Sequence, residues 1–231
     1  MLAMATTRHA KSDVITPGRI LHSISSYASS PDAAWNVHPE FASPDADVVL
    51  RSEEGTLFFV HSHTLCNASG LFRTMFTLPQ PHHDVTNSNQ PIEIPIYETD
   101  AITAPLLRLL RGPPIPSWHS FDTMECILFV AEKWDTPGPI AHIRDALMSP
   151  RFLNSDPLRL YTLAKHFGWK KEAKIAATLT LGLDLNDRRY AETLNRLTTR
   201  ELMPLLKLRR DRSVRFRELL NSPGRFVAGN R

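Results

Sequence analysis

The stretch from residue 45 to residue 76 constrains the fold most, because it passes from one ordered hydrophobic pattern to another. Two short apolar runs, at 48–50 and 56–60, flank a polar turn at 52–55, and the second run is rich in β-branched and aromatic residues. Runs of this kind, separated by a few turn residues, are typical of a β-hairpin. We therefore predict two paired strands here.

The residues that follow have a helical period. Apolar side chains recur at steps of three and four, which places them on one side of helical structure; they are Leu65, Ala68, Leu71, Phe72, Met75 and Phe76. Ser69 stands where a second short helix needs its N-cap, because its hydroxyl can accept from a backbone N–H two or three residues on. We expect a hairpin followed by two short helices that share one core.

This stretch closely resembles the opening of the BTB/POZ domain. The matching positions are Asp47 before the first strand, His61 after the second, and then Leu65, Ser69, Phe72, Met75 and Phe76. The resemblance runs on to Leu183 and is to the type common in mushroom-forming (basidiomycete) fungi, whose later part carries a segment like residues 156–177.

The resemblance implies an α+β fold, with a small BTB/POZ-like sheet and a cluster of helices, followed by a helical C-terminal extension. It also implies a protein–protein interaction module that acts as a scaffold or adaptor without catalysis, by burying apolar helix surface against a like or unlike partner. We accordingly expect a disordered N-terminal tail (1–40), a BTB/POZ-like domain (41–150) and a helical extension with a basic tail (151–231).

The N-terminal segment bears on self-association. Pro31, Pro39 and Pro44 discourage a helix that runs into the first strand. Many dimeric BTB domains have a helix just ahead of the position of Asp47, and none is evident in this sequence. We therefore expect at most a weak homodimer.

The pattern continues with a strand and several helices. Residues 92–96 alternate isoleucine with other residues and contain a proline, which suits an edge strand better than a central one. A helix follows, with Asp100 or Thr103 as its N-cap. Another helix begins at Ser120, and Pro-Gly-Pro at 137–139 breaks the chain before helical spacing resumes.

The last third reads as further helices. Asp156 followed by Pro157 is a typical helix start. Small residues on one face would let two helices approach closely; they are Ala173, Ala176, Ala177 and Thr180. The core is expected to bury Leu65, Phe72, Phe76, Leu107, Leu128 and Trp134.

Composition indicates a globular protein in a reducing compartment. Apolar residues make up 42% of the 231 residues, enough to fill a core. No apolar run approaches the roughly 18 residues of a membrane span. The two cysteines, Cys66 and Cys126, lie in apolar helical patterns that favour buried free thiols over a disulfide. We expect an intracellular protein, in the cytoplasm or the nucleus.

Positive charge is concentrated at the C-terminus. Residues 196–231 carry ten Lys or Arg against three acids, a net of +7, so with a total of +3 the first 195 residues sum to −4. A basic tail attracts nucleic acid or anionic surfaces, and residues 207–212 resemble a nuclear-import patch. The alternative function is therefore a nuclear, nucleic-acid-associated regulatory factor. We favour a solvated helix face, because no aromatic platform accompanies the charge.

The sequence offers no chemical site. His61, His63, His82, His83 and Cys66 lack the spacing of a metal site, and His61 and His63 would project to opposite faces if the strand continued. A glycosylation sequon at residues 67–69 falls in a predicted helix of a chain without a secretory signal, and we discount it. No nucleophile elbow, phosphate loop or paired-carboxylate motif is present. We assign no catalytic, cofactor or metal residue and no cofactor.

The segment 77–91 bears on one family partner. In relatives that recruit a cullin ubiquitin-ligase scaffold, the residues after the Phe72 to Phe76 helix carry an apolar anchor followed two positions later by Glu. Here the segment holds one acid, Asp84, and prolines near its start. We expect no cullin recruitment by this route.

Overall fold

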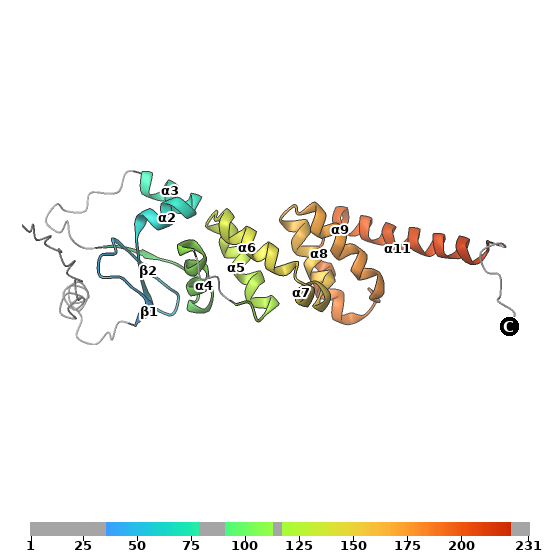
Figure 1. Cartoon of the computed structure of the whole chain (residues 1–231), viewed down its shortest axis with the longest axis horizontal. Coiled ribbons are helices and arrows are strands. Elements are labelled where there is room, and N and C mark those ends of the chain that lie inside the picture. Colours follow the sequence, from blue (N-terminus) through green and yellow to red (C-terminus); the bar gives the residue numbers. More distant parts are fainter. Residues whose placement is uncertain (1–35, 79–90, 113–116, 223–231) are drawn as a thin grey trace, which may run out of the picture. The chain divides into compact units, whose positions relative to one another are not determined.

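A computed structural model describes residues 36–78, 91–112 and 117–222 (Figure 1). In chain order the elements are β1 (Val37–Ala42), β2 (Val48–Arg51), β3 (Leu57–Val60), α2 (Ser62–Ala68), α3 (Gly70–Thr77), β4 (Ile92–Pro95), α4 (Asp100–Arg111), α5 (Phe121–Lys133), α6 (Pro137–Leu147), α7 (Pro150–Ser155), α8 (Pro157–His166), α9 (Lys170–Leu179), η2 (Thr180–Gly182), η3 (Arg188–Tyr190), α10 (Ala191–Asn195) and α11 (Thr199–Leu220), where η denotes a 3₁₀ helix.

The predicted hairpin is confirmed. β2 and β3 pair antiparallel, with Val48 opposite Val60, and lie at the centre of a four-stranded sheet of order β1-β3-β2-β4. β1 was not expected: it begins at Val37, inside the segment proposed as a tail, and pairs parallel with β3. The tail expectation can therefore hold only ahead of Val37, and residues 1–35 lie outside the described part of the chain.

β4 is an edge strand, as predicted. It pairs only with β2, in parallel register. The backbone N–H groups of Ile92 and Ile96 donate to the Asp47 and Arg51 carbonyls at 2.9 and 2.8 Å. Pro95, one residue before Ile96, therefore falls on the side of the strand that faces away from β2, and its missing N–H costs the sheet no ladder bond.

The two short helices after the hairpin are also confirmed. Ser69 is the N-cap of α3, and its hydroxyl accepts from the Phe72 N–H at 3.2 Å. The shared apolar face is narrower than expected, however. Phe72 is buried, Phe76 is only partly buried and Leu71 is exposed. The other five expected core residues, Leu65, Phe72, Leu107, Leu128 and Trp134, are each buried.

Two helix starts differ from expectation. α4 has Thr99 at its N-cap position, one residue before the earlier of the two predicted caps, and its first backbone N–H donates to the Glu54 carboxylate at 2.6 Å. α6 begins at Pro137 itself. The Pro-Gly-Pro stretch is thus the first turn of a helix, where no intrahelical N–H is needed, and the break lies earlier, at Asp135 with φ 51°.

Compactness divides the chain into two units. Unit 1 contains residues up to Pro116 together with Phe129–Pro139, and unit 2 contains Ser117–Leu128 and everything from Ile140 on. In unit 2 the Asp156 cap is confirmed, since its carboxylate accepts from the Arg159 N–H at 3.0 Å. The predicted small residues of α9 are buried. The fold is thus the expected α+β class, a small sheet with clustered helices and a helical C-terminal extension.

Three expectations fall on parts of the chain that the structure leaves out. The absence of an N-terminal helix concerns residues before 36, most of the loop at 77–91 lies in the gap at 79–90, and the last nine residues of the basic tail are also outside. In the described ranges, no helix is long and apolar enough to cross a membrane.

Candidate interaction surface

The start of α2 is held by a carboxylate from before the hairpin. His61 occupies the N-cap position and makes no capping hydrogen bond. The backbone N–H and the hydroxyl of Ser62 both donate to the Asp47 carboxylate, the N–H at 2.7 Å. Burial acts to raise the pKa of Asp47, but the hydrogen bonds from Ser62 outweigh it and hold that pKa below its ordinary value. Asp47 thus fixes the hairpin to the helices.

The inner side of α3 is fixed just as firmly. The Ser69 hydroxyl donates to the Trp134 carbonyl at 2.5 Å, and the Gly70 N–H donates to the Asp135 carbonyl at 2.9 Å. A Cβ at Gly70 would lie 1.8 Å from Oδ2 of Asp135, so any side chain there would displace that carboxylate. The ring of Phe72 packs edge-on against Trp134, with centroids 5.2 Å apart. These contacts determine which side of α3 faces outward.

The outer side of α3 carries the exposed apolar side chains of this helix. Leu71 of α3 and Leu78, the residue that caps the C-terminus of α3, are 40% and 58% exposed. Met75, partly buried, lies between them at steps of four and three, so the three residues share one side. We call Leu71, Met75 and Leu78 the α3 stripe. A rigidly held helix with an apolar outer side can bury that side against another protein.

The edge of the sheet offers a second, more polar region of unit 1. Tyr97, just after β4, is 81% exposed. Lys133 lies over its ring at 5.8 Å and forms an ion pair with the buried Glu98 at 2.6 Å. Ile92 of β4 is also exposed. Tyrosine is enriched in protein–protein interfaces relative to the rest of the surface, whereas lysine is depleted.

The condition under which His61 and His63 would project to opposite faces is not met. The strand ends at Val60 and His63 lies within α2, so the rings of His61 and His63 stack with centroids 5.2 Å apart and do not project to opposite faces. Within residues 36–78, 91–112 and 117–222, no group of three or more His, Cys, Asp and Glu is placed to hold a metal ion. His82 and His83 lie outside those ranges.

The cysteines are both free, as expected, but neither is fully buried. Cys66 on α2 is partly buried and Cys126 on α5 is exposed. The prediction of a buried thiol is therefore wrong for Cys126, because its position on α5 lies off the apolar side of that helix. Asn67, the sequon asparagine, is an exposed residue of α2, so the sequon does fall in a helix.

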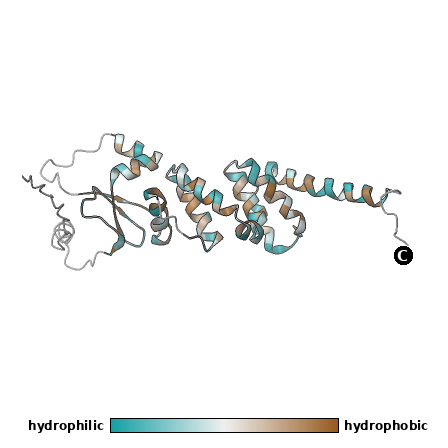
Figure 2. Cartoon of the chain, in the orientation of Figure 1, coloured by the Kyte–Doolittle hydropathy of each residue, from teal (hydrophilic) through white to brown (hydrophobic). Residues whose placement is uncertain are grey.

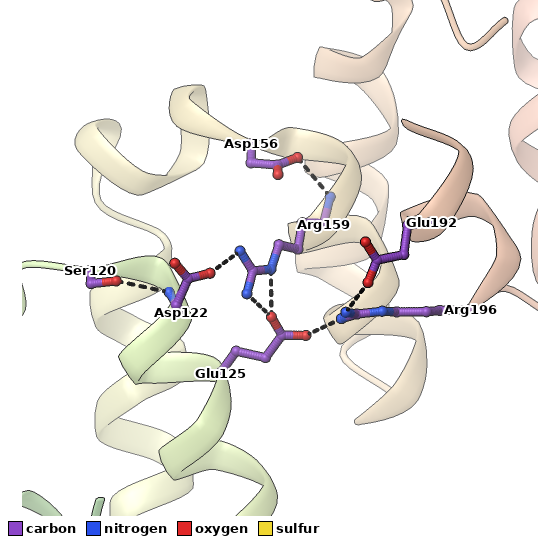
Figure 3. Close-up of polar contacts among 7 residues, drawn as sticks. All are labelled: Ser120, Asp122, Glu125, Asp156, Arg159, Glu192 and Arg196. Carbon is purple, nitrogen blue, oxygen red and sulfur yellow. Dashed lines mark hydrogen bonds and ion pairs between the residues drawn. The ribbon is translucent and has the colours of Figure 1, made fainter. Parts of the chain in front are cut away.

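Unit 2 contains a buried carboxylate network (Figure 3). The side chain of Glu125 on α5 is 7% exposed and pairs with Arg159 of α8 and, at 2.8 Å, with Arg196 after α10. Arg159 also pairs with Asp122 at 2.5 Å, and Arg196 with Glu192 at 3.2 Å. Burial acts to lower the pKa of Arg159, but its two carboxylate partners outweigh burial and raise that pKa. The network ties α5 to the helices of the extension.

A second charged pair joins α6 to α9. Arg144 contacts the Glu172 carboxylate at 2.6 Å. Burial acts to raise the pKa of Glu172, yet hydrogen bonds from its own backbone N–H and from Arg144 outweigh burial and lower this pKa. Both charged features are internal ties of unit 2, with the geometry of structural ion pairs.

The basic tail forms α11 for most of its described length. Leu205 is the buried residue of this helix, and its lysine and most of its arginines are exposed. The segment 207–212, which resembles an import patch, lies within the helix. The charge is therefore displayed on a helix, in agreement with the solvated face favoured above.

Comparison with known families supports the resemblance. The family model of the BTB/POZ domain matches residues 41–150, just under half of the chain. The match supports a BTB/POZ domain at this place, in line with the α+β fold. A search of curated proteins found no match. The matched segment includes 117–128 and 140–150, which belong to unit 2.

Sequence reasoning missed the residues that join one element to another. Glu125 could have been noticed, because Phe121, Glu125 and Leu128 follow one another at steps of four and three, which puts a carboxylate on the apolar side of α5. A charge at such a position requires a buried partner. The capping roles of Asp47 and Glu54 left no comparable local signal, since their helices begin far along the chain.

Proposed function

We propose that the protein is a scaffold or adaptor that binds other proteins through its BTB/POZ-type domain and catalyses no reaction. The observation that carries the proposal is the match of residues 41–150 to the BTB/POZ family, whose domains are generally protein–protein interaction modules. We also propose a domain boundary at 150/151, with residues 151–231 as a helical extension; the domain itself includes β1, which begins at Val37.

The α3 stripe is the surface that we assign to this function. The backbone of α3 is fixed on its inner side by the hydrogen bonds of Ser69 and Gly70. Little conformational entropy is therefore lost when a partner covers the α3 stripe. Leucine and methionine side chains on a helix bury apolar area, which drives association. Binding would require no bond chemistry.

Capture experiments with the full chain as bait test the proposal. Leu71→Glu places a charge in the α3 stripe, and Ile175→Glu is a matched control because Ile175, on α9, is 42% exposed against 40% for Leu71. We expect a partner retained in stoichiometric amount by the natural chain and by Ile175→Glu, and lost with Leu71→Glu. A partner that is retained equally by all three chains contradicts the assignment of the α3 stripe.

Self-association is proposed to be weak. A BTB/POZ-type domain favours homodimers, whereas Pro31, Pro39 and Pro44 disfavour the helix ahead of Asp47 that commonly completes the dimer. Light scattering over a concentration series should show a monomer at low micromolar concentration. A dimer that persists at nanomolar concentration contradicts this.

The remaining features of the proposal rest on the sequence. The two free cysteines support an intracellular location, in the cytoplasm or the nucleus. The segment 156–177 supports the type common in mushroom-forming fungi.

A nuclear role in nucleic-acid binding is the second candidate, favoured by the exposed arginines of α11. It predicts binding to duplex DNA or RNA that falls steeply with salt and is lost when residues 207–231 are deleted.

A further inference from the structure

The C-terminal half of α11 extends beyond the other helices of unit 2 (Figure 1). Its first half is attached: Leu205 is 1% exposed, and the Tyr161 hydroxyl donates to the Glu201 carbonyl at 2.6 Å. Arg209 makes the last anchor, donating to the Thr180 carbonyl at 2.7 Å and to that of Leu183. From Arg212 to Leu220 every side chain is exposed.

One side of this helix is apolar at both ends and cationic in the middle. Leu205, Arg209, Arg212, Phe216 and Leu219 follow one another at steps of four and three, so they form one line along the helix. We call these five residues the α11 stripe. Unit 2 covers the stripe at Leu205, whereas Phe216 and Leu219 are 61% and 40% exposed. Figure 2 shows apolar and polar residues interspersed along α11.

A hollow marks the point where the stripe leaves unit 2. It has a volume of about 290 Å³ and is lined by Leu181, Arg209, Arg212, Ser213 and Phe216. The apolar walls come from η2 and from the stripe. The guanidinium of Arg209 donates to two carbonyls, whereas that of Arg212 makes no ion pair with any described residue. The hollow thus combines apolar walls with the positive charge of Arg212.

A second copy of the chain and a membrane both fit this surface poorly. Residues 209–217 contain five arginines and one acid, so two copies of the stripe would bring like charges together. A membrane-bound helix keeps its charges off the face that enters the lipid. Here Arg212 stands between Leu205 and Phe216 in the stripe itself, and insertion of that side would bury its charge.

A protein helix with acidic and apolar residues satisfies every part of the surface. Its carboxylates would face Arg212, and its apolar side chains would cover Phe216 and Leu219. The phosphates of duplex nucleic acid would pair with the arginines but would leave Phe216 and Leu219 exposed to water. Charge complementarity and exposed apolar area together favour the protein partner.

We propose that the α11 stripe, with the hollow at its inner end, docks an acidic amphipathic helix of a protein partner. This site lies in unit 2 and goes beyond the function proposed for the α3 stripe. An adaptor with two such surfaces would hold two proteins at once.

The test uses the full chain and a fluorescently labelled synthetic peptide that carries leucines on one helical side, flanked by glutamates. Binding is followed by fluorescence anisotropy. Arg212→Glu and Phe216→Ser should each weaken binding about tenfold, the size expected for hot-spot residues. Arg210→Glu and Val214→Ser introduce the same new side chains at exposed positions on the other side of α11, and should change the affinity by no more than about twofold.

Several outcomes overturn the proposal. Equal losses with Arg212→Glu and Arg210→Glu would mean unspecific attraction to net charge, and no binding of the peptide would remove the site. Tighter binding to a random DNA duplex or to phosphatidylserine vesicles, with the same dependence on Arg212 and Phe216, would assign the surface to nucleic acid or to membrane. Self-association abolished by Phe216→Ser would assign it to a second copy. Leu71→Glu should leave peptide binding intact, which separates this test from that of the α3 stripe.

Discussion

Removal of the Glu125 carboxylate should destabilise unit 2 by a predictable amount. Loss of one partner from a fully buried ion pair costs roughly 3–5 kcal/mol, because the remaining charge is left without compensation. Here both arginines keep a second carboxylate, Asp122 at 2.5 Å and Glu192 at 3.2 Å, and the side chain of Arg196 is 47% exposed. Solvent and the remaining partners therefore reduce the cost, and we expect about 2 kcal/mol for Glu125→Ala.

The control is built into the same network. Asp122 also pairs with Arg159, but its side chain is 77% exposed, so Asp122→Ala should cost at most about 1 kcal/mol. Urea unfolding followed by far-ultraviolet circular dichroism measures both values. The joint replacement Glu125→Leu with Arg159→Leu should recover most of the loss, since apolar side chains of similar size often replace buried pairs without cost. Equal losses for the two alanine variants would refute the reasoning.

The other predictions concern single side chains. Phe72→Ala should cost about 3–5 kcal/mol by urea unfolding, and Phe76→Ala clearly less, because only Phe72 is fully buried; equal costs would contradict the packing described. Asp47→Ala should cost about 1 kcal/mol, as loss of a helix cap does, and Asp47→Asn should recover part of it. The folded state lowers the pKa of Glu172. The ionised carboxylate therefore contributes to folding stability above its ordinary pKa, and this contribution is lost as the pH falls through the lowered pKa. Between neutral pH and about pH 3, the natural chain should lose more stability than Glu172→Gln. The natural chain should capture no cullin in a pull-down. A cullin that is captured by the natural chain, but not after residues 77–91 are exchanged for a neutral linker, would contradict this prediction.

The features that the sequence predicted are those determined within a few residues. The hairpin, the Ser69 cap and the Asp156 cap each depend on neighbours in the chain, and each is confirmed. The start of α4 was misplaced because Glu54, a residue of the hairpin turn, receives its first N–H. No local pattern encodes a cap that comes from 46 residues away.

The candidate surface was less predictable than the fold. Periodicity grouped Leu71 with Phe72 and Phe76, since all three are apolar and close in sequence. Which of them faces outward is decided by the contacts of Ser69 and Gly70 with the residues after α5, and those contacts depend on tertiary structure. β1 was missed for a similar reason: Val37–Ala42 contains a proline and a glutamate and gains its strand structure by pairing with β3.

Hydrogen exchange on the captured complex tests the central claim most directly. If the BTB/POZ-type domain binds its partner through the α3 stripe, amides of Gly70–Thr77 should exchange more slowly in the complex than in the free chain, because covering a helix suppresses its local opening. Ile175→Glu should leave that protection unchanged. A complex in which Gly70–Thr77 exchanges at the rate of the free chain would contradict the account.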